Sequence, residues 1–518
     1  MAKVHSNDRA ASCQAIEAIS STEQHFDRIR RTVSLFLGPF LFIVLLLIPM
    51  PSLTPEAHRL AAVAGLILVY WVGEALPIPI TSLLAPVLCI IMGIASPAVA
   101  FAPFANPIIF LFIGSFILAQ GMIEQGLEKR IALAILSFSW IGESPSRLLI
   151  AIAAIPILTS MWISDSATTA MIYPILIGII SAFSSLAQDA DKKAASANFN
   201  QGLLLTIAYA ALIGGIGTPI GTPPNLIGIG MIDKILNVKI YFFKWMALAI
   251  PIMLMMWMMM VLYMRMIHPP AVKKIPGLVD FLRKQKALQG PFTLGQKNAL
   301  FAFLVAVVLW VFPGVIASFF GTESPVFKFC ESHIPEGVAS LIAAILLFIM
   351  PVDWKERKFT LSWTAAVRID WGTILLFGGG LSLGSLMFST GLAGVMGKNL
   401  IALSGATSLW SITAIAIALA IITTEMTSNT AAANMLVPIM IAVSQGAGVS
   451  AIPPAIGVCF GASMAFMLPV STPSNAIIYG SGLVPITRMI RAGLVLDIVC
   501  FIVVFTGMRI LCPLLGLI

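Results

Sequence analysis

Long, unbroken apolar runs constrain this chain more than any other feature. They begin near residues 34, 59, 79, 103, 202, 241, 298, 336, 372, 455 and 493. Crossing about 30 Å of hydrocarbon takes roughly 20 helical residues, and runs of this length can do so. Because lipid offers the backbone no hydrogen-bond partner, only helices or closed barrels span it, and barrel strands would alternate apolar and polar residues. The runs are continuous, so we expect an all-α polytopic membrane protein.

The composition fits a membrane protein and excludes other classes. Only 10% of the 518 residues are charged, against roughly 25% in a soluble domain. The formal charge of +8 comes from basic residues in loops between apolar runs, which is typical of the positive-inside bias and not of nucleic-acid binding. The six cysteines show no CxxC spacing, so we expect no disulfide framework, no zinc site and no cofactor.

A basic linker over residues 265–297 orients the chain. It holds a cluster of lysines and arginines against one acid, Asp280, which places it in the cytoplasm. Counting outward, we expect a cytoplasmic N-terminal tail (1–32), a retained first helix (33–57), about eleven crossings and a C-terminus outside. One loop contradicts this topology, because its basic side chains would face outward: Lys234, Lys239 and Lys244.

Three pairs of motifs recur in the same order in the two halves, 58–264 and 298–518. The stretch "SDSATTAMIYPI" from Ser164 matches "SNTAAANMLVPI" from Ser428. "FIGSFILAQGMIEQGL" from Phe112 matches "FGGGLSLGSLMFSTGL" from Phe377, and "PIGTPPN" from Pro219 matches "PVSTPSN" from Pro469. Halves with an odd number of crossings that start on opposite faces are inverted repeats, an arrangement found in many secondary transporters.

Two apolar stretches have to turn round inside the membrane if their flanking loops share a face. We therefore expect re-entrant hairpins over residues 149–183 and 408–445, each with a Ser-rich motif at its tip. Non-helical backbone is tolerated at this depth only where it is buried in protein or lines a wet cavity. The Gly-Thr-Pro-Pro and Ser-Thr-Pro-Ser stretches would break two further helices, and paired broken helices are the best sequence pointer to a transport site.

The tips contain oxygen and N–H groups but no basic side chain. Hydroxyls, an amide and freed carbonyls suit small hard cations, while the N-termini of half-helices suit an anion. A Ser/Thr/Ala-rich membrane segment is more often a close-packing face. Asp165, however, would cost about 2.5 to 3.5 kcal/mol at the bilayer centre, which favours a site. Glu425 and Glu74 could instead lie at helix ends or pair structurally.

At these motifs the sequence resembles the divalent anion/sodium symporter family, the INDY-like dicarboxylate carriers. The family's paired Ser-Asn-Thr signatures correspond to residues 164–166 and 428–430, and "SMAFMLPVSTPSNAII" from Ser463 is close to its C-terminal signature. The likeness runs from about residue 58 to the end. It implies a homodimer in the bilayer that works as an elevator. It also implies C4 dicarboxylate substrates such as succinate, malate and fumarate, with 2-oxoglutarate, citrate or sulfate in some members.

The resemblance also implies the site residues. One Na⁺ site would use Ser160, Ser164, Asp165 and backbone near Gly221, and its counterpart would use Thr424, Thr427, Asn429 and backbone near Ser471. The substrate would bind between the two motifs, at Ser164, Asp165, Ser166, Thr222, Pro223, Ser428, Asn429, Thr430, Thr472 and Pro473.

Asp165 and Ser166 depart from the asparagine and threonine that the family usually has. An ionised carboxylate a few Å from a dianion is repelled by roughly several kcal/mol at an effective dielectric near 20. Asp165 must therefore be neutralised by a tightly held Na⁺, by a proton, or by a salt bridge. We favour Na⁺ and hence symport. Exchange of dicarboxylates, proton coupling, and transport of another anion stay open as alternatives.

The sequence does not favour an enzyme or a channel. The histidines all fall in loops or tails, which leaves no Ser-His or metal constellation in the membrane: His5, His25, His58, His268 and His333. Paired closed sites in inverted halves favour alternating access over an open pore. The basic charge and the retained first helix fit a bacterial inner membrane.

Overall fold

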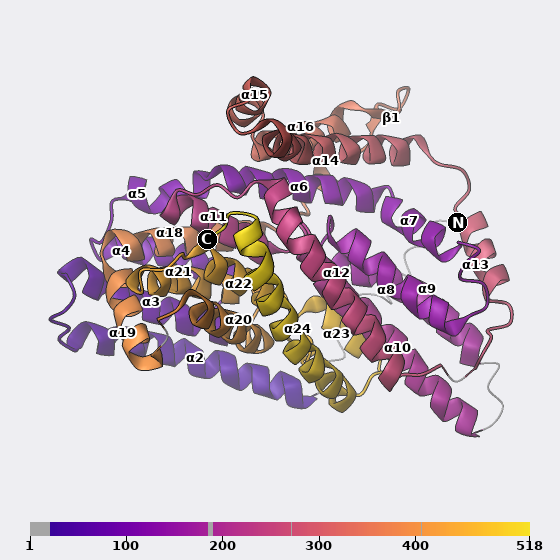
Figure 1. Ribbon diagram of the computed structural model, residues 1–518, viewed down its shortest axis with the longest axis horizontal. Helices are drawn as coiled ribbons and strands as arrows, with labels where there is room; N and C mark the ends of the chain where they lie inside the picture. Colours follow the sequence, from indigo (N-terminus) through magenta and orange to yellow (C-terminus); the bar gives the residue numbers. More distant parts are fainter. Residues whose placement is uncertain (1–20, 185–189, 271, 406) are drawn as a thin grey trace. The chain divides into compact units, whose positions relative to one another are not determined.

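The computed structural model describes residues 21–184, 190–270, 272–405 and 407–518, which are mostly helical (Figure 1). The chain forms two compact units. The first comprises Met1–Asn106, Pro223–Lys239 and Trp371–Ile518, and the second comprises Pro107–Thr222 and Ile240–Asp370. Each unit therefore combines segments from both halves of the sequence.

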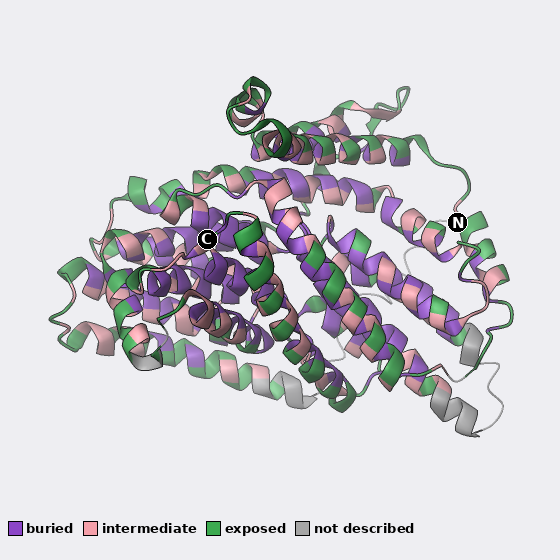
Figure 2. Cartoon of the chain, in the orientation of Figure 1, coloured by how far each residue is buried: buried purple, intermediate pink, exposed green. Residues whose placement is uncertain are grey.

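The first unit is built around a layer of buried helices. Helices α20, α21 and α22 pack closely on one another, and α21 and α22 are mostly buried (Figure 2). Helix α2 lies beside α3 with much of its surface exposed. The described elements of this unit are α2 (Ser21–Leu47), α3 (Pro55–Gly73), α4 (Ile78–Ile91), α5 (Pro97–Phe101), the 3₁₀ helix η2 (Ala102–Ala105), α11 (Pro223–Leu236), α18 (Trp371–Ser389), α19 (Leu392–Ser404), α20 (Leu409–Met426), α21 (Asn429–Gly446), α22 (Ile452–Ala462), α23 (Pro473–Tyr479) and α24 (Ile486–Leu514).

The second unit contains the long helix α12 and the pair α14 and α16, which pack on each other and on α6 (Figure 1). Its described elements are α6 (Pro107–Glu124), α7 (Leu127–Leu136), α8 (Pro145–Ser160), α9 (Asp165–Ser184), α10 (Ala190–Gly215), α12 (Phe242–Ile267), α13 (Leu278–Ala287), α14 (Leu294–Phe320), α15 (Pro325–His333), α16 (Glu336–Ile349), β1 (Pro351–Asp353), β2 (Lys358–Phe359) and α17 (Trp363–Ala366). The antiparallel β1–β2 hairpin is a small exception to the all-α prediction, formed by a polar turn outside the apolar runs.

The helices are long and apolar enough for a membrane protein. Among the described residues, seven helices meet the length and composition needed to cross a membrane, or eight if the bent pair α15 and α16 forms one span. Several shorter apolar helices, including α8 and α22, fall below that length. The predicted number of eleven crossings stays a prediction.

The first helix differs from the predicted boundaries. Residues 1–20 of the predicted tail lie outside the described residues, and α2 spans Ser21–Leu47 in place of 33–57. Its early start is stabilised by ion pairs, because Arg30 contacts Asp27 one turn before it and Glu74 at the end of α3. Glu74 also pairs with Arg31 at 3.3 Å. Glu74 therefore lies at a helix end and pairs structurally.

Matching glycine contacts recur in the two units. In the second unit, α6 meets α16 at Gly114, where a Cβ would lie 2.5 Å from the Ser340 hydroxyl oxygen. In the first unit, α18 meets α4 at Gly379, where a Cβ would lie 2.7 Å from the Ser82 carbonyl carbon. Small residues let helix backbones approach this closely. Both contacts join a helix of one half of the sequence to a helix of the other.

A second pair of matching contacts supports the two predicted hairpins. A Cβ on Gly214 of α10 would lie 2.7 Å from the Ile157 carbonyl oxygen of α8. A Cβ on Gly461 of α22 would lie 2.8 Å from the Ile417 carbonyl oxygen of α20. The first arm of each hairpin is thus held against its own supporting helix by a glycine in the same relative position.

Candidate functional site

The first predicted hairpin consists of α8 and α9, which pack together and are separated by a short break. Helix α8 ends at Ser160 and α9 begins at Asp165, so residues 161–164 form the turn. The Ser-Asp-Ser motif therefore lies at the tip, where the second helix begins. The positive end of that helix's dipole is directed at the tip.

Polar groups of the first tip bind the start of α9. The Ser164 hydroxyl accepts a hydrogen bond from the Ala167 N–H at 3.4 Å and lies 3.3 Å from the Ser166 hydroxyl. The Asp165 carboxylate accepts a hydrogen bond from the Ser166 N–H at 2.8 Å. These side chains are exposed or half-buried. The tip thus offers hydroxyl groups to an anion and a carboxylate to a cation.

Backbone oxygens converge beside this tip, around Gly221. A Cβ on Gly221 would lie 2.9 Å from the Ser160 carbonyl oxygen and 3.0 Å from that of Met161, and it would also collide with the Gly215 carbonyl oxygen. Only glycine leaves this space open. The fully buried Ser160 hydroxyl has no hydrogen-bond partner among the described residues. Such an oxygen cluster has the chemistry of a hard-cation site.

Thr218 and Thr222 complete the broken stretch. The Thr218 hydroxyl donates to the Met161 carbonyl, which holds this stretch against the hairpin tip. Thr222 is buried and ends the second unit, and Pro223 begins α11 in the first unit. Proline suits the first position of a helix because its missing N–H would have no partner there.

The second predicted hairpin has the same construction and lies in the first unit. Helix α20 ends at Met426 and α21 begins at Asn429. The Ser428 hydroxyl accepts a hydrogen bond from the Ala431 N–H at 3.2 Å, which caps α21. Like Ser164, it occupies the turn directly before a helix.

Thr424 lies at the position that corresponds to Ser160. Its hydroxyl oxygen is 2.7 Å from the Asn429 side-chain oxygen and 2.7 Å from the Ala462 carbonyl oxygen. A threonine hydroxyl has only one hydrogen to donate, so the Thr424 hydroxyl and these two oxygens form a cluster of three oxygens that share one proton. Thr427 donates instead to the Trp71 carbonyl at 3.3 Å, and Thr430 accepts through its carbonyl from Asn434.

Asn475 holds the second broken stretch, residues 463–472, in a defined shape. Its side-chain amide donates to two carbonyl oxygens of this stretch, at 2.9 and 3.1 Å. The Ser471 hydroxyl donates to the Leu468 carbonyl at 2.6 Å. The Thr472 hydroxyl accepts from the Asn475 N–H at 3.2 Å and caps α23, whose first residue is Pro473. Both broken stretches thus end at a helix that begins with proline.

Two acidic residues beside the second tip lie outside the predicted site. Glu425 accepts hydrogen bonds from the Met467 N–H (2.8 Å) and the Leu468 N–H (3.1 Å), so it ties the hairpin to the broken stretch. Asp497 is buried within α24. A lone acid in a long apolar helix is the signal that could have identified Asp497 from the sequence.

The chain is similar to known membrane transporters along nearly all of its length. Residues 30–518 match the family model described as "Sodium:sulfate symporter transmembrane region". The sodium-dependent dicarboxylate transporter SdcS of Staphylococcus saprophyticus is 33% identical over 490 residues, which cover 94% of this chain and 92% of that protein. SdcS of Staphylococcus aureus strain MRSA252 is 33% identical over 486 residues, covering 93% and 91%.

A solved structure has a similar fold. The YdaH transporter of Alcanivorax borkumensis matches with a TM-score of 0.50 and 12% identity, covering 79% of this chain and 86% of that one. At this identity the likeness concerns the fold alone. The resemblance inferred from the paired motifs is confirmed by the family model, and with it the expectation of a transporter and not an enzyme. This chain therefore belongs to the family of the sodium:sulfate symporter transmembrane region.

Proposed function

We propose that this protein is a secondary active transporter that carries C4 dicarboxylates across the membrane together with Na⁺. The Staphylococcus relatives, at 33% identity, are named sodium-dependent dicarboxylate transporters, which supports both the substrate class and the ion. The observation that carries the proposal is the oxygen cradle at Gly221 beside the unpartnered Ser160 hydroxyl. Among the described residues the buried Ser160 hydroxyl has no partner, and a bound cation would offset the cost of burying it.

The proposed ligands divide between the two hairpins. One Na⁺ would bind Ser160, Ser164, Asp165 and the backbone at Gly221, and a second would bind Thr424, Thr427, Asn429 and the backbone at Ser471. Succinate, malate, fumarate or 2-oxoglutarate would bind through the hydroxyls and amide of the two tips and through the N-termini of the helices that begin at Pro223 and Pro473. Helix N-termini and bound Na⁺ would supply the positive charge that these stretches lack in their side chains.

Asp165 would hold its Na⁺ more tightly than a neutral side chain does. Within its unit, no basic side chain among the described residues forms an ion pair with this carboxylate. A salt bridge is therefore the least supported way to neutralise it. A bound cation or proton would remove the repulsion between Asp165 and a dianionic substrate.

The matching glycine contacts support an inverted-repeat transporter. The contacts at Gly114 and Gly214 in one unit have counterparts at Gly379 and Gly461 in the other unit. We propose repeats over 58–264 and 298–518 around the linker 265–297, an elevator movement, and a homodimer as the family resemblance implies.

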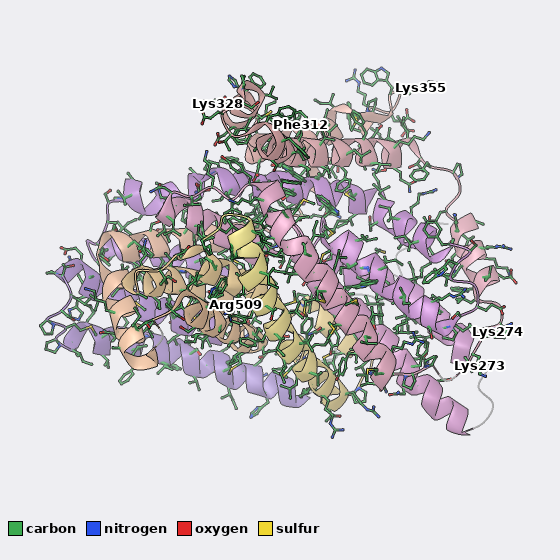
Figure 3. All side chains as sticks on the ribbon, in the orientation of Figure 1. Lys273, Lys274, Phe312, Lys328, Lys355 and Arg509 are labelled. Atoms are coloured by element: carbon green, nitrogen blue, oxygen red, sulfur yellow. The ribbon has the colours of Figure 1, made fainter. Side chains whose placement is uncertain are left out.

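The positions of basic residues support the proposed orientation in a bacterial plasma membrane. Within the second unit, Lys328 lies on α15 at one end of the α14–α16 pair, and Lys355 lies in the β1–β2 turn at the other end (Figure 3). Lys355 would be cytoplasmic together with the linker lysines, Lys273 and Lys274, and Lys328 would be outside. The N-terminus would then be cytoplasmic and the C-terminus outside.

The proposal is tested by uptake of radiolabelled succinate into proteoliposomes, loaded either with buffer or with unlabelled succinate. An inward Na⁺ gradient, a proton gradient, or neither would be imposed. We expect uptake into empty vesicles that requires Na⁺. Uptake that occurs only into preloaded vesicles and is indifferent to Na⁺ would show an exchanger and contradict the sodium sites.

A further inference from the structure

Asp497 is a buried acid that the proposed transport site does not use. It lies within α24, which packs on α20 and α22 in the first unit. Its side chain is 6% exposed, and neither carboxylate oxygen has a hydrogen-bond partner of ordinary length and angle among the described residues. An ionised carboxylate in this position would be strongly destabilising.

The polar group that faces Asp497 is another acid, Glu425. Glu425 is 2% exposed, and its two oxygens already accept N–H donors from Met467 and Leu468, so it has the hydrogen bonds of an ionised carboxylate. Two ionised carboxylates side by side in a buried site repel each other strongly, so one of them takes up a proton.

The packing of α24 brings Asp497 to this position. Gly493, one turn before Asp497, lies against the broken stretch, where a Cβ would be 2.5 Å from the Met467 nitrogen and would collide with the Phe466 carbonyl. The same face of α24 therefore contacts the segment that Glu425 binds. Asp497 thus faces the second hairpin through Glu425, which lies on its first arm, α20.

Within the part of the chain that the structure describes, no basic side chain forms an ion pair with these two acids. On the packed elements, α20 contributes Glu425 and α22 contributes Cys459, while Cys500 lies one turn further along α24. Among the described residues, no lysine or arginine forms an ion pair with either acid. Arg30 reaches the Met426 carbonyl at 3.5 Å, but its charge is shared between Asp27 and Glu74.

We propose that Asp497 carries a proton and donates it in a hydrogen bond to the Glu425 carboxylate, forming a proton-binding site directly behind the second hairpin tip. A metal ion fits less well, because the N–H donors of Met467 and Leu468 are directed at the same acid. The proton site is independent of the proposed function, whereas the link between this site and transport rests on the proposed function. Loss of the proton would add a negative charge behind a site for an anion, so the ligand-bound state favours the protonated form.

The site is tested by infrared difference spectroscopy of the purified protein, because a protonated carboxyl group has a C=O absorption band that a carboxylate lacks. We expect this band in the wild type and its loss in Asp497→Asn, which keeps the hydrogen bond to Glu425. Cys500→Ser, on the same helix, is the matched control and should keep the band. Because Glu128 contributes a band of its own below about pH 7, the spectra are compared at pH values above its titration. There, a band that survives in Asp497→Asn, or that disappears when NaCl replaces choline chloride, would overturn the proposal.

The link to transport is tested by succinate binding at pH values where succinate is a full dianion. In the wild type, the Kd should rise by up to about tenfold per pH unit as one linked proton is lost. In Asp497→Asn it should stay constant with pH while Na⁺-dependent binding remains. A wild-type Kd that does not change while the band disappears would overturn the link. If no variant binds succinate, the proposed function fails, whereas the infrared result still decides the proton site.

Discussion

At the scale of single residues, the proposed Na⁺ site at the first tip depends on the absence of a side chain at Gly221. Gly221 is required because carbonyl oxygens occupy the space around the position of a Cβ. The sequence places Gly221 in a broken helix beside Thr222, but the convergence of three carbonyls depends on how Ser160 and Met161 turn at the hairpin tip. Local patterns do not contain that information. The residue types of the site were predictable, and the cradle was not.

Replacing Gly221 with alanine should weaken cation binding at the first tip. The added methyl group would occupy the space among the carbonyl oxygens. We expect the half-saturating Na⁺ concentration to rise by about tenfold or more, equivalent to about 1.4 kcal/mol. Thermal unfolding of the detergent-purified protein across a Na⁺ titration measures this change, because a bound ligand stabilises the folded state.

Gly394 on α19 provides the control for this substitution. A Cβ there meets no atom within 4 Å, and the residue lies in a regular helix. Gly394→Ala should leave the Na⁺ titration unchanged. An unchanged titration in Gly221→Ala as well would mean that the cradle does not bind Na⁺.

Asp165→Asn tests how the carboxylate of the first tip is neutralised. If Na⁺ does so, removing the charge should weaken Na⁺ binding by about tenfold while the pH dependence of uptake stays as in the wild type. Na⁺-dependent succinate uptake at two pH values separates this result from proton binding at Asp165, which would change the pH profile. Asp233→Asn, at the opposite end of α11 from Pro223, is the control. If the Na⁺ dependence and the pH dependence of uptake are both unchanged in Asp165→Asn, this residue does not determine which ion is coupled to transport.

At the scale of helices, glycine contacts and ion pairs determine helix packing and helix ends, which hydropathy does not predict. The apolar runs predict where helices lie, but α2 begins at Ser21 because Arg30 pairs with acids on α2 and α3. The short β1–β2 hairpin forms in a polar loop that no apolar pattern marks. Helix α7 shows the same limit, since Glu128 follows a loop in the sequence yet is only 8% exposed.

Glu128 should make stability depend on pH. Burial raises the pKa of its carboxyl group to about 7, and one of its oxygens has no partner among the described residues. Because the unfolded group has a pKa near 4.5, the folded state binds more protons between these values. Stability should therefore fall as the pH rises from about 4.5 to about 7, by roughly 3 kcal/mol, and then level off.

Glu128→Gln removes this titration and should flatten the curve, leaving the variant more stable than the wild type at pH 8. Apparent melting temperatures of both proteins in detergent, at pH values on either side of the transition, measure the difference. The difference between the two proteins cancels the other titrating groups. Parallel curves for the two proteins would mean that Glu128 is ionised in the folded state.

At the scale of the whole molecule, class and family were predictable, and the assembly of the units was not. Hydropathy, the paired motifs and the basic linker lead to a membrane transporter of this family. The two compact units, however, do not coincide with the two halves of the sequence, because contacts such as Gly114–Ser340 join one half to the other. Contacts between residues that are so far apart in the sequence produce no periodic pattern in it. Asp497 could have been identified as the lone acid of a long apolar helix, but its partner Glu425 could not, because it lies on another helix.

The proposed topology makes the last prediction. In a variant with Cys13→Ser and Cys330→Ser, the remaining cysteines of the described residues are buried, so single added cysteines become selective probes. In whole cells, a membrane-impermeant thiol reagent should label Lys328→Cys and Lys239→Cys but not Lys355→Cys, which should react only after the cells are opened. The Lys239 position is the sharpest of the three, because its basic loop contradicts the positive-inside bias. Labelling of Lys355→Cys and Lys328→Cys from the same side would contradict the inverted repeat, since α16 alone separates their loops in the chain.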